Sequence, residues 1–215
     1  MGDDVTRSGA PTIEVAAYGT MPLLDVELWR GTDVIHRHPV NVPAARRGTR
    51  RTIRVQWSGV AQKSGRAKQV RWQGSLWLDG GNVLAMQPFA LDQYDDRVWR
   101  VSGQRIDFDT RTSGDFDGVL LDIEAEAGAR LRFDCSHLQC AVALGTLGPE
   151  PSVFKGRVGT TAVLFSEVAP QLTECDAVFS FTDAEAPAGC SAYWVRLSQL
   201  NGGQAWSSPI FVTRT

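Results

Sequence analysis

Apolar and polar residues alternate one by one along many short segments of the chain. This period of two restricts those segments to β-strands that bury one face. In residues 24–29, Val26 and Leu28 are expected to face a core, and Asp25 and Glu27 the opposite side of the sheet. The same alternation recurs at residues 52–57, 70–78, 119–123 and 193–197. The pattern predicts about a dozen strands.

Glycine-rich turns between these segments predict that neighbouring strands are antiparallel. Residues 79–82 (DGGN) and 201–203 (NGG) supply the positive φ values that tight hairpins need, and residues 30–33 (RGTD) are a weaker case. No stretch of ten or more residues has a 3.6-residue period, so the crossover helices of a parallel sheet are missing. The predicted fold class is all-β, an antiparallel β-sandwich with little or no helix.

The length of the chain leaves its domain count open. A chain of 215 residues fits one large β domain or two small β units packed together. Two polar breaks, at residues 42–49 and 169–176, each contain a proline and few large apolar side chains. These breaks are candidate domain edges.

Charge and hydropathy exclude several classes of partner. Lys and Arg total 22 against 24 Asp and Glu, a formal net charge of −2, which favours neither nucleic acid nor an anionic membrane. The apolar runs are far shorter than the roughly 20 residues that cross a bilayer. The N-terminus is acidic and polar, unlike a secretory signal. We expect a soluble chain with no membrane segment, and the compartment stays open.

Two groups of residues have the chemistry of metal ligands. His36 and His38 share one face of a predicted strand, but no further ligand follows at a suitable spacing, so an exposed strand face is the favoured interpretation. Cys135, His137 and Cys140 lack a second ligand pair, and a buried small thiol is favoured there. We predict no metal site from either group.

Acidic pairs resemble the alternating oxygen ligands of calcium loops. Asp107 with Asp109, and Asp115 with Asp117, have that spacing, but no bidentate Glu follows Asp115 at the required position. Alternating Asp residues are also typical of a solvated strand face. No pair stands out as a general acid and base, and no catalytic residue is predicted.

The remaining candidates are a basic cluster, a cysteine pair and surface aromatic residues. Arginines gather at Arg46, Arg47, Arg50, Arg51 and Arg54, where solvated linker charge is favoured over a site for phosphate or an acidic partner. Pairing of Cys175 with Cys190 stays open. The nucleophile and nucleotide motifs Gly-x-Ser-x-Gly and the phosphate-binding Gly loop are absent from the sequence.

Three tryptophans lie out of phase with the apolar face of their strands: Trp29, Trp77 and Trp194. Rings on a β surface stack on sugars in binding modules, and they also pack against a second sheet or domain. The sequence leaves both interpretations open. Trp29, Trp77 and Trp194, with Arg46 and Arg47, are the candidate binding residues.

The C-terminal stretch resembles the end of a known family. The residues that carry the likeness there are Tyr193, Trp194, Arg196, Trp206, Ser207, Ser208 and Pro209. They are similar to the closing hairpin of a bacterial family of PHP-like (polymerase and histidinol phosphatase) metal-dependent hydrolases. Weaker likeness is found at residues 11–15, 19–20, 26–31, 71–74 and 112–114. The likeness therefore extends over most of the chain.

The resemblance implies a β region whose catalytic domain lies upstream. In that family the metal ligands are His and Asp residues of a barrel-like domain, so a divalent metal is expected only there and no cofactor in this chain. Met1-Gly2 matches an internal family position, which implies a fragment. The likeness also predicts that residues 1–45 pair with residues 170–215 into a small sandwich, with residues 46–169 inserted as a second β unit.

The resemblance thus implies a non-catalytic accessory β domain of a PHP-like hydrolase of the phosphoesterase class. Its partner would be the upstream catalytic domain, which it stabilises or orients. The alternative is a free-standing β-sandwich that binds carbohydrate or a protein. A purely structural or oligomerising domain is a third possibility, and the oligomeric state and the substrate of the parent enzyme stay open.

Overall fold

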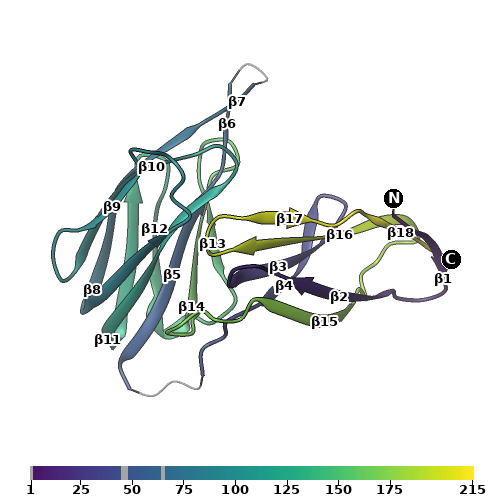
Figure 1. Cartoon of the computed structure of the whole chain (residues 1–215), viewed down its shortest axis with the longest axis horizontal. Coiled ribbons are helices and arrows are strands. Elements are labelled where there is room, and N and C mark those ends of the chain that lie inside the picture. Colours follow the sequence, from purple (N-terminus) through teal and green to yellow (C-terminus); the bar gives the residue numbers. More distant parts are fainter. Residues whose placement is uncertain (1, 45–47, 64–65) are drawn as a thin grey trace. The chain divides into compact units, whose positions relative to one another are not determined.

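The computed structural model describes residues 2–44, 48–63 and 66–215 (Figure 1). These residues form an all-β fold of packed antiparallel sheets, consistent with a β-sandwich. These residues form eighteen strands, more than the dozen expected, and one 3-10 helix, Leu144–Thr146. The predicted fold class is confirmed. None of the helical structure in these residues is long and apolar enough to span a membrane.

The chain divides into two compact units. Unit 1 combines Met1–Asn41 with Leu172–Thr215, and unit 2 is the continuous segment Val42–Gln171. The two connections between them pass through the polar segments 42–49 and 169–176. Each unit has a hydrophobic core of its own.

Unit 1 contains two sheets. Its strands are β1 (Asp4–Arg7), β2 (Thr12–Tyr18), β3 (Leu23–Arg30), β4 (Asp33–Pro39), β15 (Asp176–Thr182), β16 (Gly189–Gln199), β17 (Gln204–Trp206) and β18 (Ile210–Arg214). The larger sheet has the order β1-β18-β16-β3-β4, with β17 also pairing with β16, and the smaller sheet pairs β15 with β2. Strand β1 is parallel to β18, and the other pairs are antiparallel.

The two sheets of unit 1 face each other across a small core. Val15 of β2 and Ala177 of β15 pack in one cluster with Val26 of β3 and the half-buried Val195 and Leu197 of β16. The strand order resembles that of immunoglobulin-type sandwiches. In that nomenclature β2 and β15 correspond to strands B and E, and β4, β3, β16 and β18 of the larger sheet correspond to strands C′, C, F and G. Unit 2 is then inserted between C′ and E.

Two of the three predicted hairpins are confirmed in unit 1. Gly31, with φ of 59°, lies in the turn between β3 and β4, and Gly202, with φ of 87°, in the turn between β16 and β17. The expected polar side of β3 is corrected, because Asp25 and Glu27 are both buried. For Glu27 the reason is local, since two arginines and an indole hold its carboxylate.

Unit 2 is dominated by one eight-stranded sheet. Its strands are β5 (Arg50–Ser58), β8 (Val70–Phe89), β9 (Arg97–Arg100), β10 (Arg105–Thr112), β11 (Phe116–Cys135), β12 (Gln139–Ala143), β13 (Ser152–Lys155) and β14 (Ala162–Val168). The order is β13-β14-β5-β11-β8-β10-β9, and β12 pairs with β11. A separate short hairpin joins β6 (Ala61–Lys63) to β7 (Arg66–Lys68).

The predicted hairpin at residues 79–82 is wrong, because this segment lies inside the twenty-residue strand β8. Strands β8 and β11 pair on both sides of it, with register shifts between Asp122 and Ile123 and between Ala125 and Arg130. Such irregularities bend a strand without ending it. Gly81 is required by the close approach of β11, because a Cβ there would lie 2.6 Å from the Glu124 carbonyl oxygen.

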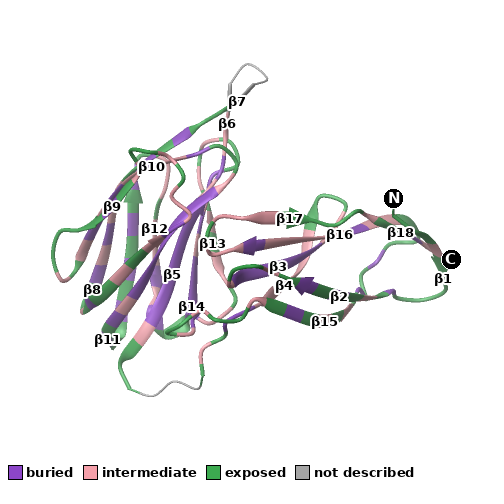
Figure 2. Cartoon of the chain, viewed as in Figure 1, coloured by how far each residue is buried: buried purple, intermediate pink, exposed green. Residues whose placement is uncertain are grey.

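The central strands of unit 2 carry many buried residues (Figure 2), and aromatic side chains are prominent among them. Trp57 and Trp72 are fully buried. Their indole N–H groups donate to the hydroxyls of Thr110 and Thr112, each at 2.9 Å. The Trp57 ring stacks on Phe108 at 4.9 Å between centroids. The core therefore satisfies both indole donors without water.

Candidate functional site

The pairing of β3 with β16 brings two of the predicted binding residues together in unit 1. Trp29 and Trp194 are register partners, and their rings stack at 4.7 Å between centroids with 14° between their planes. The Trp29 indole N–H donates to Glu27 Oε2 at 3.1 Å, and that of Trp194 to the Gly31 carbonyl at 2.9 Å. Because both donors are used within the protein, neither is left for a sugar hydroxyl.

Glu27 is the centre of a charged cluster beside these rings. Its carboxylate accepts from Arg37 Nε at 2.9 Å and lies 2.6 Å from Arg196 Nη2. The Arg196 guanidinium also lies 5.1 Å from the centroid of Trp29. Two arginines thus compensate one buried carboxylate, and one of them stacks on the aromatic pair. This cluster holds the Trp29–Trp194 pair in place.

An apolar groove of about 350 Å³ lies between β2 and the segment from β16 to β18. Leu28 and Val195 are among its lining residues, and Tyr18, Trp206 and Ile210 line it as well. Tyr18 is 70% exposed and Trp206 58% exposed. Large apolar side chains exposed together are typical of an interaction surface. We call this feature the β2 groove.

The β2 groove runs beside an unpaired strand edge. In the described part of the chain, β2 pairs with β15 along one edge and with no strand along the other. The unpaired edge of a strand presents main-chain donors and acceptors that an added strand can use. The groove therefore combines apolar surface with main-chain hydrogen-bonding capacity.

The C-terminal motif residues are divided among the groove, the charged cluster and the core. Trp206, Ser207 and Ser208 line the β2 groove. Ser207 extends the β16 pairing, because its N–H donates to the Val195 carbonyl and its hydroxyl accepts from the Val195 N–H, both at 2.9 Å. Pro209 directly precedes β18. The motif thus builds one wall of the groove.

Tyr193 has a buried role in a polar triad with Arg30 and Asp183. Its hydroxyl donates to Asp183 Oδ2 at 2.9 Å, and Arg30 Nη1 lies 2.7 Å from the same oxygen. Burial raises the pKa of Tyr193 to about 12, and the hydrogen bond to Asp183 raises the pKa of Arg30. The triad fastens the loop after β15 to β3 and β16.

The other predicted binding residues lie outside this site. Trp77 belongs to unit 2, where the Arg105 guanidinium lies 4.8 Å from its ring centroid. Arg46 and Arg47 lie outside the described residues. The interpretation of the arginine cluster as solvated linker charge is wrong for Arg54. This residue is buried in β5, and its Nε donates to the Ser166 hydroxyl at 3.0 Å. Its position inside a central strand explains the difference.

The histidine pair does not form an exposed strand face. His36 and His38 are half-buried, and His38 stacks on Phe179 at 4.3 Å while His36 stacks on Phe181 at 4.8 Å. Burial, and after it the charge of His36, lower the pKa of His38. Both rings thus pack against β15.

All four cysteines are free thiols in this structure. Cys135 is buried, which confirms the predicted small thiol, and burial raises the pKa of Cys140 to about 12. Cys175 and Cys190 are free thiols in this structure.

A group of carboxylates in unit 2 was not predicted as a unit. Asp117 lies near Asp92 and Asp96, which precede β9, and one ligand oxygen from each lies within 4.8 Å of the others. The sequence spacing pointed to Asp115 as the partner of Asp117 instead. Nothing in the local pattern places the β8–β9 loop against the start of β11, so only the sheet register reveals this group.

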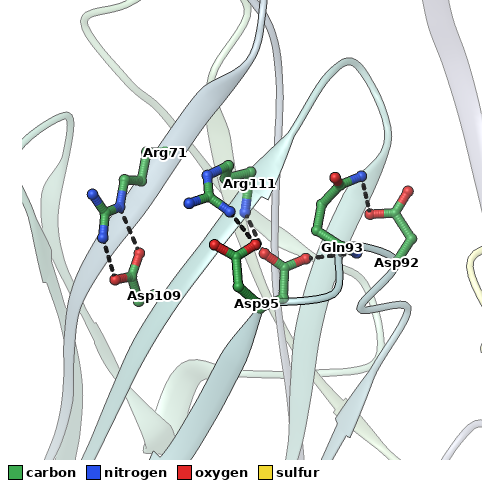
Figure 3. A network of polar contacts seen from close by, with 7 residues as sticks. Arg71, Asp92, Gln93, Asp95, Asp109 and Arg111 are labelled. Atoms are coloured by element: carbon green, nitrogen blue, oxygen red, sulfur yellow. Dashed lines mark hydrogen bonds and ion pairs between the residues drawn. The ribbon is translucent and has the colours of Figure 1, made fainter.

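The neighbouring acidic residues are paired with arginines. Arg71 Nε donates to Asp109 Oδ1 at 2.7 Å, and the Arg111 guanidinium donates to Asp95. Figure 3 draws both pairs. Asp107 accepts from Arg105 at 2.7 Å. Asp107 and Asp109 thus carry ion pairs along β10.

Comparisons with protein-family models, with curated proteins and with solved structures found no match to this chain.

Proposed function

We propose that this chain is a non-catalytic β module that binds a protein partner in the β2 groove. The observation that carries the proposal is the combination of exposed Tyr18 and Trp206 with the unpaired edge of β2. An extended segment can add to such an edge by main-chain hydrogen bonds while alternate side chains enter the groove. Carbohydrate is the weaker candidate, because the indole donors of Trp29 and Trp194 are already used.

The proposed partner is a PHP-like catalytic domain of the phosphoesterase class. Its support is the sequence resemblance, whose most specific residues, Trp206 to Ser208, form a wall of the groove. Binding there would orient the catalytic domain without supplying a reacting group. The chemistry, and the divalent metal that it needs, would belong to the partner.

The test is a calorimetric titration of the chain with a PHP-like domain produced as a separate polypeptide. We expect saturable binding and slower amide exchange in β2, because its free edge gains hydrogen bonds. Tyr18→Ala and Trp206→Ala should each raise Kd about tenfold or more, as truncated aromatic anchors at interfaces do.

Trp99→Ala is the matched control, since Trp99 is also exposed but lies on β9 in unit 2. It should leave Kd unchanged. Unaltered binding by the Tyr18 and Trp206 variants would contradict the groove as the site. A mass that rises with concentration and falls in these variants would instead indicate a second copy of the chain. Phosphoester hydrolysis by the chain alone would contradict the non-catalytic role.

A further inference from the structure

Asp117 is a buried carboxylate with no hydrogen bond of normal geometry. Its exposed fraction is 0%, and both Oδ1 and Oδ2 lack such a bond, although the Thr110 hydroxyl lies near enough to favour the ionised form. It lies on β11 directly opposite Trp57 of β5, at the edge of the aromatic core. An ionised carboxylate in such a place is costly unless a cation or hydrogen-bond donors compensate it. Its position therefore needs an explanation beyond packing.

Two further carboxylates face the same point from the β8–β9 loop. One oxygen each of Asp92, Asp96 and Asp117 lies within 4.8 Å of the other two. Asp96 is fixed there by main-chain N–H groups, which donate from Gln93 at 3.1 Å and from Arg111 at 3.0 Å. Asp92 is exposed, so the group opens to solvent on one side.

Two arginines on the strands beside this loop, Arg71 of β8 and Arg111 of β10, are paired with other carboxylates. The Arg111 guanidinium pairs with Asp95, and Arg71 pairs with Asp109. The Asp96 and Asp92 carboxylates repel the charge of Asp117, and burial is the main cause that raises its pKa to about 8. An added cation would compensate this group of carboxylates.

We propose that Asp92, Asp96 and Asp117 bind a calcium ion at the start of β11. All three side chains offer hard oxygen ligands, which calcium and magnesium prefer. Calcium accepts six to eight oxygens in irregular geometry, including carbonyls and water, whereas magnesium demands a near-ideal octahedron. A set made of one deep carboxylate, one fixed loop carboxylate and one exposed carboxylate suits the more tolerant ion.

Calcium would bind the ionised carboxylates of all three residues. The site does not depend on the proposed β2 groove, because all three ligands belong to unit 2. It would join the β8–β9 loop to β11 and hold that end of the sheet together.

The experiment is a calcium titration of the EDTA-treated full chain, followed by calorimetry and by thermal unfolding. We expect one calcium ion per chain, with Kd on the order of 10⁻⁵–10⁻³ M. The Tm should rise by several degrees in saturating calcium. Asp92→Asn and Asp117→Asn should each raise Kd at least tenfold.

Asp79→Asn is the control, because Asp79 is a carboxylate of unit 2 that pairs with Arg132 and is not one of the three proposed ligands. It should bind calcium as the wild type does. Asp92 is exposed, so its variant tests the site even if Asp117→Asn does not fold. The proposal is overturned if adding calcium produces no binding heat and no change in Tm. It is also overturned if both ligand variants bind calcium as the wild type does, or if only magnesium binds.

Discussion

Replacing Asp183 with alanine should lower the free energy of unfolding of unit 1 by about 3–5 kcal/mol, because it breaks a buried ion pair from one side. The Arg30 guanidinium would lose its carboxylate, and the buried Tyr193 hydroxyl would lose its acceptor. The Glu185 N–H, which donates to Asp183 Oδ1 at 3.2 Å, would lose its partner as well. The loop after β15 would then lack its attachment to β3 and β16.

Urea unfolding combined with amide exchange of peptides from β3 and β16 measures this loss. Asp176→Ala is the matched control, since Asp176 is exposed at the start of β15 and should cost less than about 0.5 kcal/mol. Asp183→Asn keeps an acceptor for Tyr193 but loses the charge, so it should fall between the two. Wild-type exchange rates in the alanine variant would show that the triad does not stabilise unit 1.

In EDTA, unit 2 should become less stable as the pH rises from about 4 to about 8. The cause is Asp117, whose pKa burial raises from 3.8 to about 8 in the folded chain. Between these values the folded state holds a proton that the unfolded state has lost, so the free energy of unfolding falls by about 1.4 kcal/mol per pH unit. Carboxylates at Asp92, Asp96 and Asp115 add to the effect, and the Thr110 hydroxyl opposes it.

Urea midpoints at pH 5, 6 and 7, followed by circular dichroism, test this dependence. Asp117→Asn removes the titrating group and should flatten the slope, whereas Asp115→Asn should keep most of it. Saturating calcium should also reduce the fall, because the ion replaces the proton. A slope that is the same in the wild type and in Asp117→Asn would mean that another group titrates.

The period-two pattern was enough to predict the fold class, because alternation reports directly on which face of a strand is buried. Residues 70–78 illustrate this, since Val70, Trp72, Leu76 and Leu78 are in the core of unit 2 while Arg71 and Gln73 are exposed. The glycine-rich turn residues predicted a hairpin correctly only where the chain does reverse direction. The residues NGG at 201–203 end a strand, but DGGN at 79–82 lets a long strand bend, and the two sequences look alike locally.

The candidate site was less predictable, since it depends on pairings between distant segments. The phase of the alternation marks both Trp29 and Trp194 as candidates, but their stacking depends on the register of β3 against β16. The β2 groove depends on which strand edge is left unpaired, which no local pattern encodes. The sequence marks Asp117 only as part of a short acidic pair, because the loop that approaches it is more than twenty residues earlier in the chain.

The pairing of β1 with β18 also bears on the order of events during synthesis. Val5 lies beside Val212, so the sandwich of unit 1 cannot close until the ribosome has released β18. All strands of unit 2 are made before residue 172, and they can fold while unit 1 is still incomplete. Contacts between segments so far apart in sequence form slowly. A nascent chain arrested after residue 171 should therefore hold a protease-resistant core of unit 2 beside exposed β2, β3 and β4.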